Sequence, residues 1–328
     1  MDKSAGKVMR KDAIFRIYSM TKAVTAVSAM MLWEEGRFQL GDPISKYLPE
    51  FAAVSPKQPI RVVDLFRHTS GVIDYSAVTP AFYKEHPDYP VIVDPKIDLA
   101  EVVRRIAKIP LLHTPGTTFH YGYSVDVLGR LVEVISGKTL EQFFQERLLQ
   151  PLGMKDTGFY VPKEKLDRLV VLDEPGPDGK VIRSKGYGQD SYATKPAAFL
   201  GGQGLVSTAT DYSRFCQMLL NGGVFEGKRY LGRKTVEMMS TDYLVDMPRA
   251  GASQPGPGTG FGLTFAITLH PAATGLAGSK GEYFWSGAAG TRFWIDPLEK
   301  MITIFMVNTL PPLGVEKPFK AMVYSALE

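Results

Sequence analysis

The sequence has little of several features on which common classes of protein depend. A single cysteine, Cys216, among 328 residues excludes an internal disulfide and a cysteine-based zinc cluster, and its apolar neighbours predict a buried side chain. Neither sign of charge dominates, because 38 Lys and Arg face 34 Asp and Glu and leave a net charge of +4. We therefore expect no nucleic-acid partner, since such binding depends on a clustered basic face. The most apolar stretch, residues 23–33, is shorter than the ~20 residues that span a membrane, so no transmembrane helix is expected.

The sequence also lacks the motifs of metal sites and of the commonest serine hydrolases. It contains no His-Glu-x-x-His and no Gly-x-Ser-x-Gly. None of the five histidines has the spacing of a metal ligand. They are His68, His86, His113, His120 and His270. We therefore expect no metal, no cofactor and no Ser-His-Asp triad. Only His120, beside Tyr121, is worth testing as a catalytic group, and His68 is expected to make structural hydrogen bonds.

The first residues lack the apolar core of a secretory signal. We expect a cytoplasmic protein on this ground, and a periplasmic or secreted one stays open because the N-terminus looks incomplete. The oligomeric state is left open as well.

The order of the predicted elements is typical of an α/β (α+β) fold. Apolar periodicity and caps predict helices over 20–35, 125–135, from Thr139 to about 150, from Thr208 to about 221, and over 319–327. Strand patterns come late, over 261–269, 283–286, 291–295 and 301–307, and the Gly-rich run 251–262 is predicted to be a loop at the rim of the active site. We expect an antiparallel sheet flanked by helices, with residues 1–40 and 165–328 in an α/β lobe and 41–164 in a mainly helical lobe.

Ser19 and Lys22 stand three residues apart at the start of the apolar helix predicted over 20–35. This spacing places both side chains on one helix face, where the N-terminal end favours a developing anion. Apolar surroundings disfavour the charged form of a lysine, and a neutral lysine can accept a serine proton. The pattern is weak alone, since Ser4 and Lys7 also match it in a polar, Gly-broken terminus.

Two companion motifs decide between these matches. A tyrosine that relays a proton is expected on a loop before a helix, and Tyr121 and Tyr123 both lie in such a place. The third motif is a strand edge that ends in glycine and offers a backbone N–H, and Trp285-Ser286-Gly287 fits it as a variant.

With these motifs in order, the chain resembles the serine hydrolases of the class C β-lactamase and penicillin-binding-protein superfamily, and most closely the family VIII carboxylesterases. The likeness runs along nearly the whole chain. Besides the three motifs it includes the segments 15–22, 68–71, 115–117, 126–129 and 151–154.

The resemblance implies a role for each matching residue. Ser19 matches the nucleophile, Lys22 and Tyr121 the general-base pair, and the backbone N–H groups of Ser19 and Ala288 the oxyanion hole. Tyr123 is the second choice for the tyrosine. Whether Lys22 or Tyr121 is the base stays open, because the two titrate as a coupled pair.

Trp285 departs from the family pattern, in which β-lactamases carry a lysine. The missing cation removes a grip on a substrate carboxylate worth about 1.5–3 kcal/mol, so neutral esters are expected to gain over β-lactams. The side chain of Trp285 is expected either to line an acyl pocket with Phe284 and Tyr123 or to pack in the core. Ser286 and Gly287 complete the expected substrate-binding residues.

The start of the chain departs too, because only 18 residues precede Ser19 where family members carry a helix and early strands. A missing strand is expected to leave an unpaired sheet edge.

The predicted function is hydrolysis of short-chain carboxylic esters through an acyl-enzyme on Ser19, with weak β-lactam hydrolysis as a side activity. β-Lactamase, D-aminopeptidase and acyltransferase activities are alternatives within the superfamily. A non-catalytic binding or assembly module with the same fold is the alternative from another class.

Overall fold

The computed structural model describes residues 1–2, 5–89, 94–176, 181–184, 191–251 and 253–328. Its helices are α1 Thr21–Glu34, α2 Val62–Phe66, α3 Pro80–Glu85, α4 Leu99–Ile106, α5 Ser124–Ser136, α6 Leu140–Phe144, α7 Ala209–Leu220, α8 Arg233–Met239, α9 Pro271–Thr274 and α10 Glu316–Tyr324. Its strands are β1 Phe15–Arg16, β2 Phe119–His120, β3 Asp173–Pro175, β4 Val181–Arg183, β5 Val206–Ser207, β6 Val224–Phe225, β7 Lys228–Arg229, β8 Arg249–Ala250, β9 Thr259–Phe261, β10 Ala266–Thr268, β11 Tyr283–Ser286, β12 Arg292–Asp296 and β13 Met301–Phe305. Two 3₁₀ turns matter below, η1 (Tyr18–Met20) and η5 (Lys163–Arg168).

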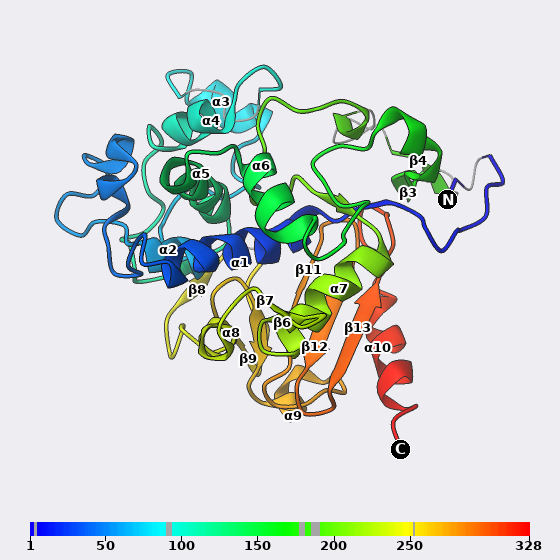
Figure 1. Ribbon diagram of the computed structural model, residues 1–328. Helices are drawn as coiled ribbons and strands as arrows, with labels where there is room; N and C mark the ends of the chain where they lie inside the picture. Colours follow the sequence, from blue (N-terminus) through cyan, green and yellow to red (C-terminus); the bar gives the residue numbers. More distant parts are fainter. Residues whose placement is uncertain (3–4, 90–93, 177–180, 185–190, 252) are drawn as a thin grey trace.

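A five-stranded antiparallel sheet, in the order β13-β12-β11-β10-β9, forms the lower part of the molecule in Figure 1. Side chains alternate between its two faces. α7 covers one face, where the ring of Tyr212 lies 5.2 Å from that of Phe293, and α10 covers the other, where the ring of Phe319 lies 4.9 Å from that of Phe305. In the described part of the chain β13 is an edge strand with no neighbour beyond it. The predicted fold class is confirmed.

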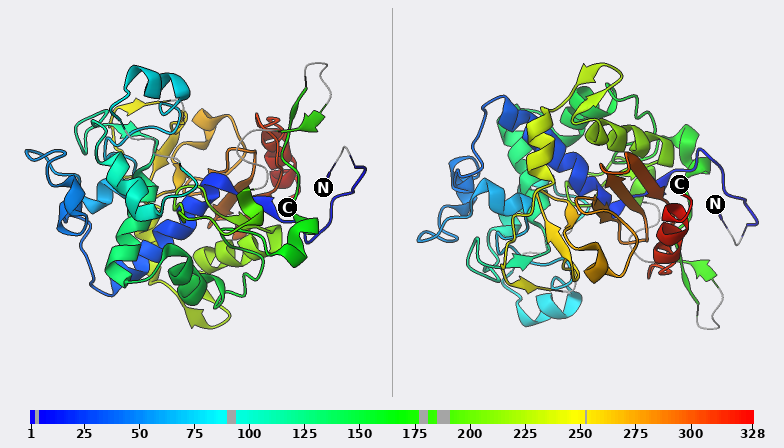
Figure 2. Two further views of the ribbon diagram at one scale, coloured as in Figure 1. Left: turned by 90° about the horizontal axis from the view of Figure 1, so that it is seen from above. Right: turned by 90° about the horizontal axis from the view of Figure 1, so that it is seen from below.

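α1 runs through the centre of the molecule, with α2 to α6 gathered on one side and the sheet on the other (Figures 1 and 2). Residues 21–32 of this helix are all buried. Its polar side chains bind a loop of the chain instead of water: Thr25 Oγ1 donates to the carbonyl of Gly201 at 2.7 Å, and Thr21 Oγ1 accepts from the N–H of Leu205 at 3.0 Å. The lobe boundaries at residues 40 and 164 stay a prediction. Within the described ranges, every helix is too short or too polar to cross a bilayer.

The predicted strand over 261–269 is too long, because residues 262–265 form a turn between β9 and β10 and only Ala266–Thr268 continue as a strand. The N–H of Gly262 donates to the carbonyl of Phe265 at 2.8 Å, and Thr264 closes the turn with a φ of +73°. A Cβ at Gly262 would lie 2.2 Å from the carbonyl oxygen of Met239, so only glycine lets the chain turn there. The other predicted helices and strands are confirmed to within a few residues.

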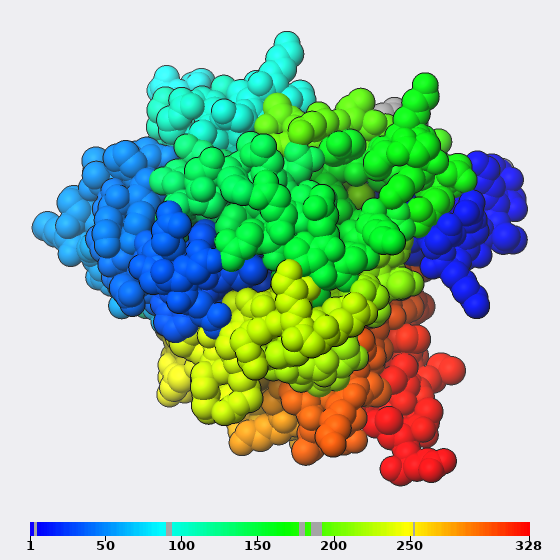
Figure 3. Space-filling model, in the orientation of Figure 1, coloured from blue at the N-terminus to red at the C-terminus, as the bar shows by residue number. Residues whose placement is uncertain are grey.

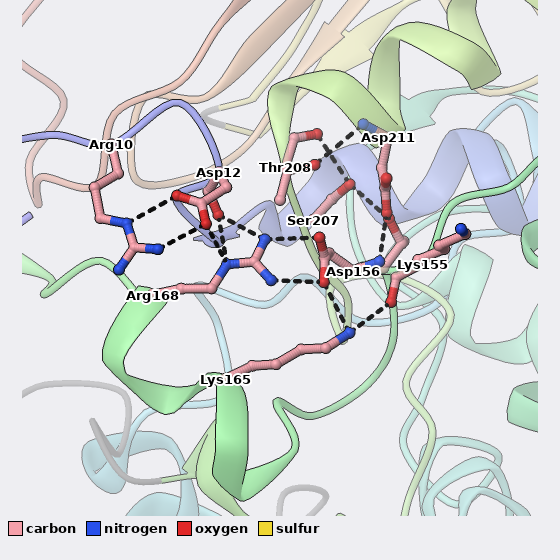
Figure 4. Close-up of polar contacts among 10 residues, drawn as sticks. Arg10, Asp12, Lys155, Asp156, Lys165, Arg168, Ser207, Thr208 and Asp211 are labelled. Atoms are coloured by element: carbon pink, nitrogen blue, oxygen red, sulfur yellow. Dashed lines mark hydrogen bonds and ion pairs between the residues drawn. The ribbon is translucent and has the colours of Figure 1, made fainter.

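A network of charged side chains fastens the N-terminal segment to the body of the protein (Figure 4). The guanidinium of Arg168 in η5 donates to the carbonyl oxygen of Asp12 and to both carboxylate oxygens of Asp156, at 2.6–2.9 Å. Asp156 also accepts from Lys165 at 2.8 Å, and its backbone N–H donates to Asp211 at the start of α7 at 2.7 Å. On the surface, the N-terminal residues lie against the segment that contains η5 (Figure 3). The network therefore steadies the chain that leads into β1 and η1.

We expect Arg168→Met to lower the free energy of unfolding by about 1–2 kcal/mol at neutral pH, because it removes charged hydrogen bonds that are only partly exposed to water. The hydrogen bond from Arg168 is the largest cause that lowers the pKa of Asp156. A lowered carboxyl pKa gives stability that is present above the ordinary aspartate pKa of about 3.9 and is lost as the pH falls through the folded value.

Urea unfolding of wild type and variant between pH 7 and pH 3 measures both effects. The difference should be constant at higher pH and shrink below about pH 4. Arg10→Met is the matched control, since the Arg10 side chain is 47% exposed in its ion pairs. An Arg168→Met loss no larger than that of the control would contradict the assigned role.

Candidate active site

Ser19 lies on the 3₁₀ turn between β1 and the first residue of α1. β1 pairs with β5 in antiparallel register, and the backbone then turns sharply at Tyr18, whose φ of +43° is rare for a side chain of this size. Met20 N donates to the carbonyl of Ile17 at 3.0 Å and closes the turn. The side chain of Ser19 is thereby half-buried and faces a cavity, at the positive end of the central helix.

Lys22 is buried one turn into α1, with 1% of its surface exposed. Its Nζ lies 3.1 Å from Ser19 Oγ and donates to the carbonyl oxygen of Gly202 at 2.6 Å. The ring centres of Tyr121 and Tyr75 lie 4.6 and 4.9 Å from the same atom. Lys22 forms no ion pair with any described residue. The amine is therefore held against the serine by a neutral carbonyl and two aromatic faces.

Tyr121 follows β2 and lines the same cavity as Ser19. β2 pairs in parallel with β8, and the ring of Tyr121 packs 5.5 Å from that of Trp285 and 4.5 Å from that of His68. The hydroxyl of Tyr121 makes no hydrogen bond to a described residue. The structure thus brings Ser19, Lys22 and Tyr121 together, as the motifs predict.

Tyr123, the second choice, lies elsewhere. It is 2% exposed, its ring packs at a tilt 4.2 Å from that of Tyr75, and it does not line the cavity. The structure therefore does not bring Tyr123 to a place where it could contact a substrate in the cavity.

The third motif, Trp285-Ser286-Gly287, packs against the turn that carries Ser19. A Cβ on Gly287 would lie 2.2 Å from Thr291 Oγ1 and 2.5 Å from the carbonyl oxygen of Ile17, so glycine is required for this close approach. Gly287 N donates to the carbonyl of Thr291 at 2.7 Å and closes the turn after β11. The backbone N–H groups of Ser19 and Ala288 have no acceptor among the described residues. Both residues border the cavity, so two free donors are available there.

The cavity has a volume of about 410 Å³. The expected substrate-binding residues Trp285, Ser286 and Gly287 all line it, and so do residues 253–256 of the predicted rim loop. The indole of Trp285 also packs 5.2 Å from the ring of Phe261, so it serves both the core and the cavity wall. Its Nε1 is buried and has no partner in the described part of the chain.

Three more residues lie near the site: Tyr75, Asp126 and Gly202. Asp126 is fully buried, accepts the hydroxyl of Tyr75 on one oxygen, and accepts the N–H of Gly202 on the other at 2.9 Å. Burial raises the pKa of Asp126, while the charge of Lys22 and the Tyr75 hydrogen bond oppose the rise. Asp126 therefore fixes the loop around Gly202, and the carbonyl of Gly202 in turn accepts a hydrogen bond from Lys22. Asp126 lies in the segment 126–129 that carries the family resemblance, whereas the sequence contains no site signal for Tyr75 or Gly202.

The histidines take positions beside the site. His68 is fully buried, accepts from the N–H of Gly122 at 3.4 Å, and has a pKa well below the ordinary value because of its burial. His120 bonds to Asp74 at 3.0 Å and to His113 at 2.9 Å. No described histidine hydrogen bonds to Ser19. The structural role predicted for His68 agrees with this geometry.

Two expectations concern other parts of the chain. Cys216 is buried, as predicted. Ser4, the other match to the serine-lysine spacing, lies outside the described residues, and no group of three or more potential metal ligands gathers in the residues that the structure covers.

A serine, a buried lysine and a tyrosine meet at the junction of a helical region and an antiparallel sheet, an arrangement typical of serine hydrolases of the penicillin-recognising type. Comparison with known proteins agrees: the sequence profile of the beta-lactamase family matches residues 1–322, and the chain belongs to this family. The predicted resemblance is confirmed.

Individual relatives cover most of the chain. Protein Rv1367c of Mycobacterium tuberculosis (strain ATCC 25618 / H37Rv) is 34% identical over 96% of this chain and 82% of its own length. Esterase EstB of Burkholderia gladioli is 29% identical over 94% of this chain and 80% of its own length. Among solved structures, EstCE1, a hydrolase with promiscuous acyltransferase activity, superposes with a TM-score of 0.83 at 25% identity, over 98% of this chain and 88% of its own.

The role of Gly202 leads to a stability prediction. A Cβ at this position would lie 2.1 Å from the hydroxyl oxygen of Tyr75 and 2.5 Å from Asp126 Oδ2, so Gly202→Ala should lower the free energy of unfolding by about 1–3 kcal/mol through overpacking. Gly41→Ala is the matched control, because nothing lies within 4 Å of its added Cβ. Thermal and urea unfolding measure both variants. Equal stability of the two would show that the loop yields easily and does not fix Lys22.

Proposed function

We propose that this protein hydrolyses short-chain carboxylic esters through an acyl-enzyme on Ser19. The observation that carries the proposal is the 3.1 Å contact between Lys22 Nζ and Ser19 Oγ, in a cavity that Tyr121 also lines. The esterase among the relatives and the hydrolase among the structural neighbours support it.

Acylation begins with the proton of Ser19. When Lys22 is neutral, one N–H is spent on the carbonyl of Gly202, and the amine lone pair can face Ser19 Oγ. Ser19 then attacks the ester carbonyl, and its proton passes to the pair formed by Lys22 and Tyr121. The backbone N–H groups of Ser19 and Ala288 stabilise the negative charge on the carbonyl oxygen, each by a factor of about 10²–10³ in rate.

Tyr121 is placed to complete the proton transfer. Tyr121 lines the cavity, and its ring lies 4.6 Å from Lys22 Nζ, so its hydroxyl can relay a proton to the leaving alkoxide. Water then attacks the acyl-enzyme, and the same two groups move protons in the reverse direction.

Trp285 disfavours β-lactams relative to esters, because it replaces the lysine with which β-lactamases bind the carboxylate of a β-lactam. Its apolar ring lies in the cavity wall where β-lactamases have a lysine, so a substrate carboxylate finds no cation at that position. We therefore propose β-lactams as weak alternative substrates. Transfer of the acyl group to an alcohol or an amine differs only in the acceptor that attacks the acyl-enzyme.

Replacing Ser19 tests the proposal directly. Ser19→Ala should abolish turnover of p-nitrophenyl butyrate without loss of the fold, because the acyl-enzyme cannot form. Ser28→Ala, which changes a buried serine of the same helix whose hydroxyl has no described partner, should leave activity intact. Ester assays, a chromogenic cephalosporin and circular dichroism measure the outcome. An active Ser19→Ala protein would sink the mechanism, and a folded wild type without an initial burst or turnover would favour the non-catalytic module.

Two tyrosines form a matched pair for the second test. Tyr121→Phe should lower kcat by about 10²–10⁴, the usual contribution of a general acid or base, with little change in KM. Tyr123→Phe removes the same hydroxyl two residues away, outside the cavity, and should keep kcat within a fewfold. Steady-state kinetics of both variants decide between them. The reverse order of effects would transfer the role to Tyr123.

A further inference from the structure

The cavity that contains Ser19 is also lined by a cation, Arg292, which belongs to none of the three sequence motifs. Arg292 begins β12 and lies directly opposite Ser286 in the register of β11 and β12. Cross-strand partners project from the same face of a sheet, so Arg292 shares a face with Ser286 and Phe284, whereas Trp285 projects from the other. The Arg292 side chain is 30% exposed and lines the wall of the cavity.

This cation is incompletely paired. One terminal nitrogen of Arg292 lies 3.1 Å from the carboxylate of Glu316, the first residue of α10. The Nε of Arg292 is buried and has no partner in the described ranges. A guanidinium has five N–H donors, so one contact leaves most of them unused. Burial lowers the pKa of Arg292, and Glu316 only partly opposes this. A second anion would therefore stabilise the charge.

The neighbouring cation of α10 offers a contrast. Lys320 is 3% exposed, and its Nζ contacts Glu282 at 2.6 Å, where Glu282 also accepts from Thr268 and Tyr324. That charge is already neutralised within the protein. Arg292 is thus the cation of this sheet face with capacity for a ligand.

There is room beside Arg292 for a substituent of the substrate. A second hollow, of about 310 Å³, adjoins the active-site cavity and shares Gly256, Thr259, Phe284 and Arg292 with it. Its lining also contains Lys317 and Lys320, of which Lys320 is neutralised by Glu282. Arg292 and Lys317 thus stand against the single carboxylate of Glu316. The junction of the two hollows therefore presents a net positive charge near the serine.

We propose that Arg292 binds a carboxylate carried by the substrate, so that the enzyme prefers esters with an anionic end over neutral esters of equal size. The inference rests on the proposed function, and it adds the class of ester. The planar guanidinium suits a carboxylate because two parallel N–H groups can face its two oxygens. Arg292 is a specificity residue, and the reaction at Ser19 does not require it.

Matched substrates test the proposal. For the acyl side, mono-p-nitrophenyl glutarate is compared with p-nitrophenyl pentanoate; for the alcohol side, 3-carboxyphenyl acetate is compared with phenyl acetate. Wild type should show a higher kcat/KM for the charged member of at least one pair, and the pair that responds tells which side of the ester faces Arg292. Arg292→Met should reduce that preference about tenfold and leave the neutral ester within twofold.

Two more variants fix the interpretation. Arg292→Lys keeps the charge without the fork and should lie between wild type and Arg292→Met. Glu316→Gln removes the competing carboxylate and should raise the preference for the charged ester, an effect opposite to general damage. Arg104→Met, an arginine on α4 with 56% of its side chain exposed, is the control and should change nothing. No charge preference in wild type, or the same preference in Arg292→Met, would overturn the proposal.

A binding measurement separates this inference from the proposed function. Calorimetric titration of the Ser19→Ala protein with monophenyl glutarate should give a Kd about tenfold lower than that of the Ser19→Ala/Arg292→Met protein. This result holds for a protein that hydrolyses no ester. Equal affinities would refute the role of Arg292 even where wild type turns over every ester offered.

Discussion

The contact on which the site depends is that of a fully buried lysine with a serine hydroxyl and a backbone carbonyl. Removing an ammonium group from water is expensive unless its hydrogen bonds are replaced. Lys22 meets no carboxylate in ion-pair distance among the described residues; it has the carbonyl of Gly202 at 2.6 Å and two tyrosine rings. The buried amine is therefore satisfied by a neutral carbonyl and the serine hydroxyl, without an ion pair.

The polar side chains of α1 explain how distant parts of the chain meet at this contact. Three side chains of α1 form hydrogen bonds to the backbone between Gly201 and Leu205, a loop about 180 positions away along the chain. They are Thr21, Lys22 and Thr25. Asp126 grips the same loop from α5 through the N–H of Gly202. Apolar packing alone does not fix the position of α1 along its axis, because it is not directional. These hydrogen bonds are directional and fix that position.

Much of this arrangement follows from the sequence because its signals are local. Caps at Thr139 and Thr208 and the alternation of β11 to β13 mark elements whose own residues determine them. Ser19 and Lys22 could be found because helical spacing places them on one face. Tyr75 carried no such signal, since it reaches the site through a loop and contacts Asp126 across 51 positions. The hairpin of β9 and β10 was missed because its turn depends on the carbonyl of Met239, a tertiary contact.

The electrostatics of the cavity follow from the same distinction. The third motif places Trp285 where β-lactamases carry a lysine and so shows that this cation is missing. A sequence motif, however, describes positions along a single strand only. Whether a cation enters from the next strand depends on the register of β11 with β12, which sets Arg292 opposite Ser286. A substitution that removes charge at one position of a sheet can thus leave the charge of the cavity intact, because the neighbouring strand supplies it on the other face. The selectivity of such an enzyme is a property of paired strands, and the motif alone describes only one of them.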